Sequence, residues 1–142
     1  MTIVRDAIHK ICSNVSTCSF ETGGIMGSRD GVLVSEIIMD PTVSEVYRCC
    51  YIPHIKYFNK CIEEWNEKNI IFMGMFHTHF YNVGTLSDGD LKYINTIMRA
   101  MPKKINRLYF PIYTLPQNEM ICYEAQREHN NISIKKDSLE II

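Results

Sequence analysis

Apolar residues recur at helical spacing in three segments of the chain, and each segment is followed by a residue or loop that ends a helix. Three or four residues separate neighbouring apolar positions, which is the spacing that lines one face of an α-helix. Pro53 suits the start of the second segment, and Pro102 stops the third. The predicted helices cover roughly residues 3–16, 53–69 and 87–101. Their apolar positions include Val4, Ala7, Ile11 and Val15, then Phe58, Cys61 and Trp65, then Leu91, Ile94 and Met98.

Strand patterns fill most of the remaining chain. The residues Ile70 to Phe76 form a continuous apolar run of the kind found in a buried central strand. Arg29-Asp30-Gly31 indicates a hairpin turn between two strands, and a polar loop is expected from His77 to Leu86. The predicted strands are 25–27, 31–38, 46–52, 70–76, 108–113, 120–124 and 132–136. This order predicts an α/β domain built around one mixed sheet.

Composition narrows the classes of protein to consider. The 142 residues are 46% hydrophobic, which favours one folded domain over residues 1–142 and excludes a disordered chain. Fifteen Lys and Arg against 16 Asp and Glu give a net charge of -1, so no basic field for nucleic acid is expected. The apolar runs are too short for a membrane span and the start lacks a signal-peptide pattern, so we expect a soluble, cytoplasmic protein.

The six cysteines are Cys12, Cys18, Cys49, Cys50, Cys61 and Cys122, and none stands in a C-x-x-C pair. Adjacent Cys49 and Cys50 would point to opposite faces of a strand, which suits neither a zinc ribbon nor a disulfide. We therefore expect free thiols that pack as small hydrophobic groups.

Two histidines directly follow the most apolar predicted strand. In an extended chain, His77 and His79 point to the same side, so both imidazoles can reach one metal ion. A catalytic zinc takes three protein ligands and leaves one position for water. Asp90, eleven residues after His79, lies in the first turn of the third predicted helix and is the candidate third ligand.

The same residues have a plainer interpretation. Ser87-x-x-Asp90 before an apolar run is also the pattern of a helix capping box, and either motif alone is common in unrelated proteins. The conjunction of His77, His79, Ser87 and Asp90 favours a metal site over a capping box alone.

The full pattern, His77-x-His79, seven residues, then Ser87-x-x-Asp90, resembles the signature of the JAMM (MPN-plus) zinc metalloproteases. Phe20 to Gly27 is similar to that family's Glu-containing entry to its first strand, with Glu21 as the acidic residue. The resemblance spans roughly residues 3–101 and is closest to small, single-domain, bacterial-type members. It implies a single MPN-like, cytidine-deaminase-like α+β domain with a mixed, curved sheet flanked by helices.

The resemblance also implies a role for each residue. His77, His79 and Asp90 would hold one catalytic Zn²⁺ with a water, whose pKa the metal lowers. Glu21 would act as general base and acid, and Ser87 would donate a hydrogen bond to the developing oxyanion. The implied reaction is hydrolysis of an isopeptide or peptide bond after the Gly-Gly-type tail of ubiquitin or a ubiquitin-like protein.

Two departures from the family pattern affect the expected substrate groove. Phe80 and Leu86 stand where the family usually has proline, which leaves the ligands untouched but makes substrate choice open. The implied partners are ubiquitin-like proteins and their conjugates, with activating and conjugating enzymes of the same pathway. Three alternatives remain: a peptidase that trims a sulfur-carrier protein, a non-catalytic MPN scaffold that binds proteins, and a nucleic-acid function, to which the near-neutral charge gives no support.

Overall fold

The three predicted helices are present in the computed structural model, which describes residues 1–41 and 51–142. They are α1 (Arg5–Val15), α2 (Ile55–Glu67) and α3 (Asp88–Ala100). Each buries the face that its apolar spacing predicts, and the buried residues are Ala7, Ile11 and Val15 in α1, Phe58, Cys61 and Trp65 in α2, and Ile94 and Met98 in α3.

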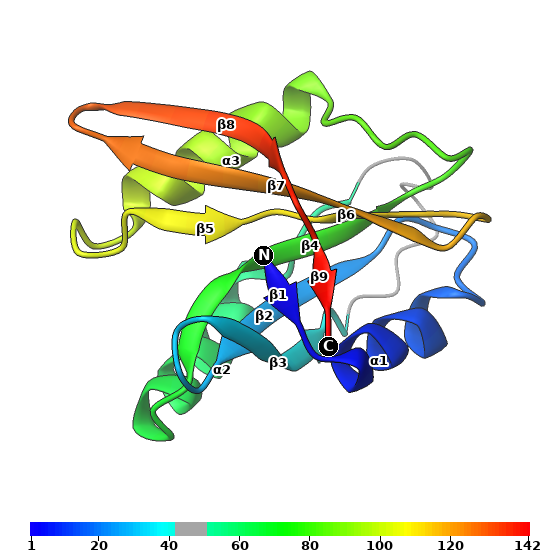
Figure 1. Ribbon diagram of the computed structural model, residues 1–142, viewed down its shortest axis with the longest axis horizontal. Helices are drawn as coiled ribbons and strands as arrows, with labels where there is room; N and C mark the ends of the chain where they lie inside the picture. Colours follow the sequence, from blue (N-terminus) through cyan, green and yellow to red (C-terminus); the bar gives the residue numbers. More distant parts are fainter. Residues whose placement is uncertain (42–50) are drawn as a thin grey trace.

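The described residues form one sheet of nine strands. In chain order the strands are β1 (Thr2–Ile3), β2 (Gly23–Ser28), β3 (Leu33–Met39), β4 (Ile71–His79), β5 (Arg107–Tyr109), β6 (Ile112–Thr114), β7 (Glu119–Glu128), β8 (Asn131–Asp137) and β9 (Glu140–Ile141). The sheet order is β5-β7-β6-β4-β2-β3-β1-β9, with β8 paired to β7 (Figure 1). β4 is antiparallel to β2 but parallel to β5 and β6, so the sheet is mixed, as expected.

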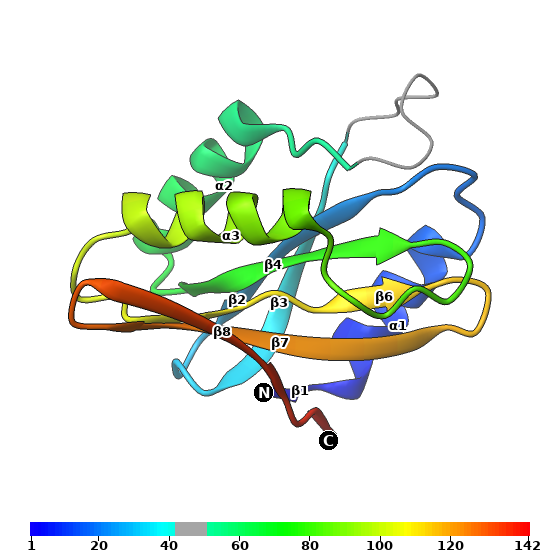
Figure 2. The same ribbon diagram turned by 90° about the horizontal axis from the view of Figure 1, so that it is seen from above.

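The helices cover both faces of this sheet. α2 and α3 lie on one face and α1 on the other (Figure 2). Two apolar cores result, because α1 packs with residues such as Met26 and Phe76, whereas α2 and α3 pack with Ile25 and Met75. Ile25 and Met26 are adjacent in β2 and point to opposite cores, as the alternation of a strand requires. The expected α+β architecture, a mixed sheet flanked by helices, is confirmed.

Several element boundaries differ from the predictions. The central strand continues to His79, so His77 and His79 belong to β4 and not to a loop. Hydrogen bonds explain the extension, since β4 pairs with β6 through residues 77–79. The sequence did not predict β1 and β9, because two residues are too few to show a periodic pattern. Of the predicted strand 46–52, residues 46–50 lie outside the described residues, and Tyr51 and Ile52 are in no strand.

Cys49 and Cys50 also lie outside the described residues, whereas Cys12, Cys18, Cys61 and Cys122 are free thiols, as expected. In the described part of the chain, no helix is long and apolar enough to cross a membrane.

Candidate metal centre

A β-bulge in the middle of β4 changes which residues face α3. Met26 of β2 pairs with Gly74, but the next residue, Gly27, pairs with Phe72, so β4 has one extra residue at this point. Gly74 has a φ of +138°, and a Cβ there would lie 1.8 Å from the carbonyl oxygen of Tyr109 in β5. Only glycine accommodates both the conformation and the close approach.

The bulge determines the direction of the two histidines. Phe72 and Met75 both pack in the core beneath α2 and α3, although they are three residues apart and strict alternation would place them on opposite faces. From Met75 onward the alternation is regular, with Phe76 in the α1 core. His77 and His79 therefore point to the same face as Met75, where α3 begins.

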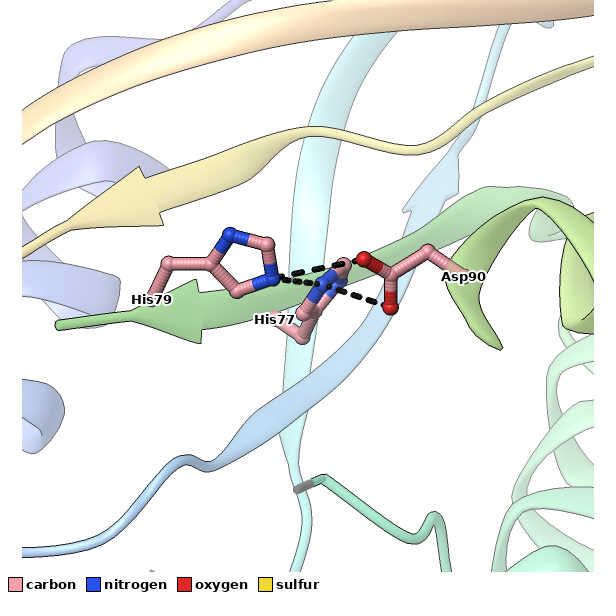
Figure 3. Close-up of side chains that lie close together, drawn as sticks. All are labelled: His77, His79 and Asp90. Carbon is pink, nitrogen blue, oxygen red and sulfur yellow. Dashed lines mark hydrogen bonds and ion pairs between the residues drawn. The ribbon is translucent and has the colours of Figure 1, made fainter. Parts of the chain in front are cut away.

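Three side chains from β4 and α3 converge at this point (Figure 3). Nε2 of His77 lies 3.2 Å from Oδ1 of Asp90, and Nε2 of His79 lies 3.4 Å from Oδ2. The two Nε2 atoms are 2.9 Å apart. The candidate ligand atoms of all three residues lie within 4.8 Å of one another, so the structure brings together the three residues that the sequence predicts as metal ligands.

Local contacts orient the ring of His79 and keep Asp90 ionised. Nδ1 of His79 lies 3.0 Å from the carbonyl oxygen of Val83, so Nδ1 carries the proton that it donates there and Nε2 is the nitrogen that faces Asp90. Burial by itself raises the pKa of Asp90, but hydrogen bonds from His77 and His79 outweigh it and hold that pKa far below its usual range. Asp90 is therefore an ionised carboxylate beside two imidazole nitrogens, a donor set that zinc and similar divalent metals favour.

The metal interpretation and the capping-box interpretation of Ser87-x-x-Asp90 are compatible. Oδ2 of Asp90 accepts hydrogen bonds from the backbone N–H and the hydroxyl of Ser87, at 2.7 and 2.8 Å. The backbone N–H of Asp90 in turn donates to the Ser87 hydroxyl, which completes a capping box at the start of α3. The capping box thus orients the carboxylate that faces the histidines.

Glu21 precedes β2 and lines the same cavity as His77, His79 and Asp90. Burial raises the pKa of Glu21, while the nearby imidazoles of His79 and His77 act in the opposite direction. The cavity has a volume of about 480 Å³, and all five predicted site residues line it. These residues are Glu21, His77, His79, Ser87 and Asp90.

The interior and rim of the cavity are mainly apolar. Met75, Ile94 and Phe110 line it near the cores, while Ile52 and Tyr81 line it with 59% and 85% of their surface exposed. Exposed apolar side chains beside polar groups that face one point are typical of a site that binds a substrate.

Phe80 and Leu86, the two departures from the pattern that the sequence resembles, both anchor the loop after β4. Phe80 packs against the α1 core, and Leu86 packs against the core beneath α2 and α3. The loop is therefore fixed at each end by an apolar side chain on a different face of the sheet. Its backbone supplies the Val83 carbonyl that holds His79.

Sequence reasoning missed Tyr51, which lines the cavity, and Asp40, which holds the Tyr51 hydroxyl. The ring of Tyr51 is stacked on that of His77, and its hydroxyl donates to Oδ2 of Asp40. Neither residue belongs to a motif, and their proximity arises only from the fold. Of the other histidines, His54 caps α2 by accepting a hydrogen bond from the N–H of Tyr57. The nearby cysteine of α2, Cys61, is buried in the core.

Comparison with solved structures supports an MPN-like fold. A JAB1/MPN domain protein from Archaeoglobus fulgidus is similar over 100% of this chain and 99% of its own, with 19% identity and a TM-score of 0.61. A protein from Desulfitobacterium hafniense, known from a solution structure, is similar over 100% of this chain and 93% of its own, with 14% identity and a TM-score of 0.70. No family model and no curated protein matches the sequence. The chain therefore has an MPN-like fold with a group of side chains that could hold a metal ion.

Proposed function

We propose that this chain is a JAMM-type zinc metallo-isopeptidase or peptidase. Its substrate would be ubiquitin or a ubiquitin-like protein, cleaved after a Gly-Gly-type tail during deconjugation or precursor processing. The observation that carries the proposal is the convergence of His77, His79 and Asp90 in an MPN-like fold, with Glu21 and Ser87 lining the same cavity.

The donor set suits zinc in number and in kind. Two imidazole nitrogens and one carboxylate make a three-residue set, which leaves a position for water in a four-coordinate site. Zinc held there would supply a Lewis acid that polarises a carbonyl group and lowers the pKa of water. Proton transfer and stabilisation of the oxyanion would be carried out by side chains of the protein.

Glu21 would move the proton. Its half-buried carboxylate lines the cavity that contains the three ligands, so it can accept a proton from the attacking water and return it to the leaving amine. Ser87 supplies a hydroxyl at the start of α3. That hydroxyl would donate to the developing oxyanion, while the backbone N–H of Ser87 keeps its hydrogen bond to Asp90.

A polypeptide substrate is favoured by the exposed apolar groups along the cavity. Ile52, Tyr81 and Val83 are 59%, 85% and 47% exposed, which is enough apolar surface to hold an extended tail. An extended tail ending in glycine could place its last carbonyl over the metal ligands, because glycine has no side chain to obstruct the approach. The partners would be conjugates of a ubiquitin-like protein and the enzymes that activate and attach it.

Hydrolysis of defined fusions tests this function. Zinc-loaded protein is incubated with a ubiquitin-like protein that carries either a linear C-terminal extension or a Lys-linked peptide. Glu21→Gln should lower kcat/KM by at least about 100-fold, the usual contribution of a general base, and should leave zinc bound. Glu63→Gln, at an exposed position of α2, is the matched control and should retain full activity.

The pattern of cleavage separates the candidate functions. Preference for the Lys-linked substrate supports deconjugation, and preference for the linear extension supports trimming of a carrier protein. A zinc-loaded protein that cleaves neither substrate, or a Glu21→Gln variant with full activity, would contradict the proposed mechanism. Binding without cleavage would instead favour a scaffold role.

A further inference from the structure

The side chain of Tyr51 lies parallel to the imidazole of a candidate metal ligand. The ring centroids of Tyr51 and His77 are 6.2 Å apart, and their planes differ by 10°. This separation and angle fall within the range of offset-stacked aromatic pairs. The contact restricts the tilt of the His77 ring, which determines where its Nε2 points.

The two candidate histidine ligands are held in different ways. His79 is oriented through Nδ1, which lies 3.0 Å from the carbonyl oxygen of Val83. Within residues 1–41 and 51–142, no comparable hydrogen bond reaches Nδ1 of His77, whose polar contacts with His79 and Asp90 are made by Nε2. The His77 ring therefore lies between the parallel ring of Tyr51 and the edge-on ring of His79, whose centroid is 4.6 Å away, and Tyr51 is the neighbour that is not itself a candidate ligand.

Tyr51 is itself fixed by a buried carboxylate. Its hydroxyl donates to Oδ2 of Asp40 at 2.9 Å, and Asp40 is only 8% exposed. The same oxygen accepts the backbone N–H of His54 at 2.9 Å, and the backbone N–H of Asp40 donates to the carbonyl of Gly23 at 2.8 Å. Asp40 thus ties Tyr51 to the start of β2 and to the N-terminus of α2.

Gly23, the first residue of β2, leaves room for the ring of Tyr51 because it has no side chain. A Cβ on Gly23 would lie 2.7 Å from Cε1 of Tyr51, closer than carbon atoms can approach. The ring of Tyr51 therefore lies against both a candidate metal ligand and the first residue of β2.

We propose that Tyr51 is a positioning residue of the metal centre: its ring fixes the His77 imidazole, and Asp40 fixes the ring. This inference rests on the proposed function, because it assumes that His77 binds a metal ion. Outer residues that orient a metal ligand typically contribute 10- to 100-fold to metal affinity.

Titration with Co²⁺ and Zn²⁺ tests the inference without any substrate. Tyr51→Leu removes the ring, and we expect it to lower the affinity for both metals by about 10- to 100-fold and to change the visible Co²⁺ spectrum, which reports coordination geometry. Tyr51→Phe keeps the ring but loses the bond to Asp40. We expect a smaller loss of affinity with a spectrum close to that of the wild type.

Tyr57→Leu and Tyr57→Phe are the matched controls. Tyr57 is a partly buried tyrosine in the first turn of α2 whose ring meets His54 edge-on and Phe58 at a tilt and contacts neither candidate histidine ligand. Its variants should keep the affinity and spectrum of the wild type. Wild-type affinity and spectrum in both Tyr51 variants would overturn the inference, as would an equal loss of affinity in the Tyr57 variants.

Other outcomes remain decisive. If Tyr51→Leu does not fold, Tyr51→Phe decides alone, and wild-type affinity in that variant overturns the role of Asp40 and with it the inference. A wild-type protein that binds neither metal contradicts the metal centre itself. That result is distinguishable from a failure confined to Tyr51, in which the wild type and all variants bind metal equally well.

Discussion

Asp90 takes part in two local structures at once, because a carboxylate has two oxygens and about four acceptor positions. Oδ2 completes the capping box with Ser87, and Oδ1 faces the imidazole of His77. The ordinary helix start and the candidate metal ligand are therefore not competing explanations. The hydrogen bonds that begin α3 also fix the direction of the ligand.

Asp30 provides a test of pH dependence away from the metal centre. Hydrogen bonds from the backbone N–H groups of Leu33 and Val32, and from the hydroxyl of Ser28, lower the pKa of Asp30 to about 2. An unfolded Asp titrates near a pKa of about 3.9. Since the folded pKa is the lower one, the ionised carboxylate stabilises the fold above pH of about 4, and this contribution is lost as the pH falls through about 2.

Asp30→Asn keeps an acceptor oxygen but cannot ionise. We expect the wild type to be more stable than Asp30→Asn at neutral pH, and the difference to vanish near pH of about 2. Urea unfolding of both proteins between neutral pH and pH of about 2 measures the difference in the free energy of unfolding. A stability difference between the two proteins that stays constant with pH would show that the charge of Asp30 does not stabilise the turn between β2 and β3.

The candidate metal ligands were predictable from sequence because they follow a short spacing. His77 and His79 share a side because they are two residues apart in a strand, and Asp90 follows in the next helix. Tyr51 and Asp40 have no such spacing to the ligands. Their contacts depend on how β2, β3 and α2 pack, which no local pattern records.

At the scale of elements, β4 shows what periodicity cannot detect. The apolar run from Ile70 predicted a central strand correctly, but an unbroken apolar run does not show which residues face which side. Gly74 is the one sign of a bulge in that run, since glycine inside a strand often marks a bulge or a close backbone approach. The bulge then places His77 and His79 on the face of α3.

Gly74→Ala should destabilise the protein strongly. A Cβ would lie 1.8 Å from the Tyr109 carbonyl oxygen, and alanine rarely adopts a φ of +138°. We expect a loss of more than about 3 kcal/mol in the free energy of unfolding.

Gly89→Ala is the control for this substitution. A Cβ at Gly89, in the first turn of α3, would meet only the Ser87 hydroxyl at 3.5 Å. Its free energy of unfolding should match or slightly exceed that of the wild type, because alanine favours helix. Chemical denaturation compares the three proteins, and equal stability of Gly74→Ala and the wild type would disprove the importance of the bulge.

At the scale of the whole molecule, fold and candidate chemistry rest on separate observations. The periodic patterns predicted three helices and a mixed sheet, and similarity to solved structures at 14% and 19% identity, the second of them a JAB1/MPN domain protein, supports that architecture. Only the spacing of a few polar residues pointed to a metal, and the fold brings those residues together. The order of strands in the sheet was not predictable, because pairing between distant segments leaves no periodic signal.

Metal stoichiometry is the measurement that tests the central claim most directly. Protein loaded with Zn²⁺ and then desalted should retain one zinc per chain, and Asp88→Asn, at an exposed position in the first turn of α3, should do the same. Asp90→Asn and the double variant His77→Ala, His79→Ala should lose the metal. At a free zinc concentration of about 100 times Kd, the wild type should also gain about 2.7 kcal/mol in stability, which the double variant should not. A wild type that retains no zinc, or a double variant that retains as much as the wild type, would contradict a metal centre formed by His77, His79 and Asp90.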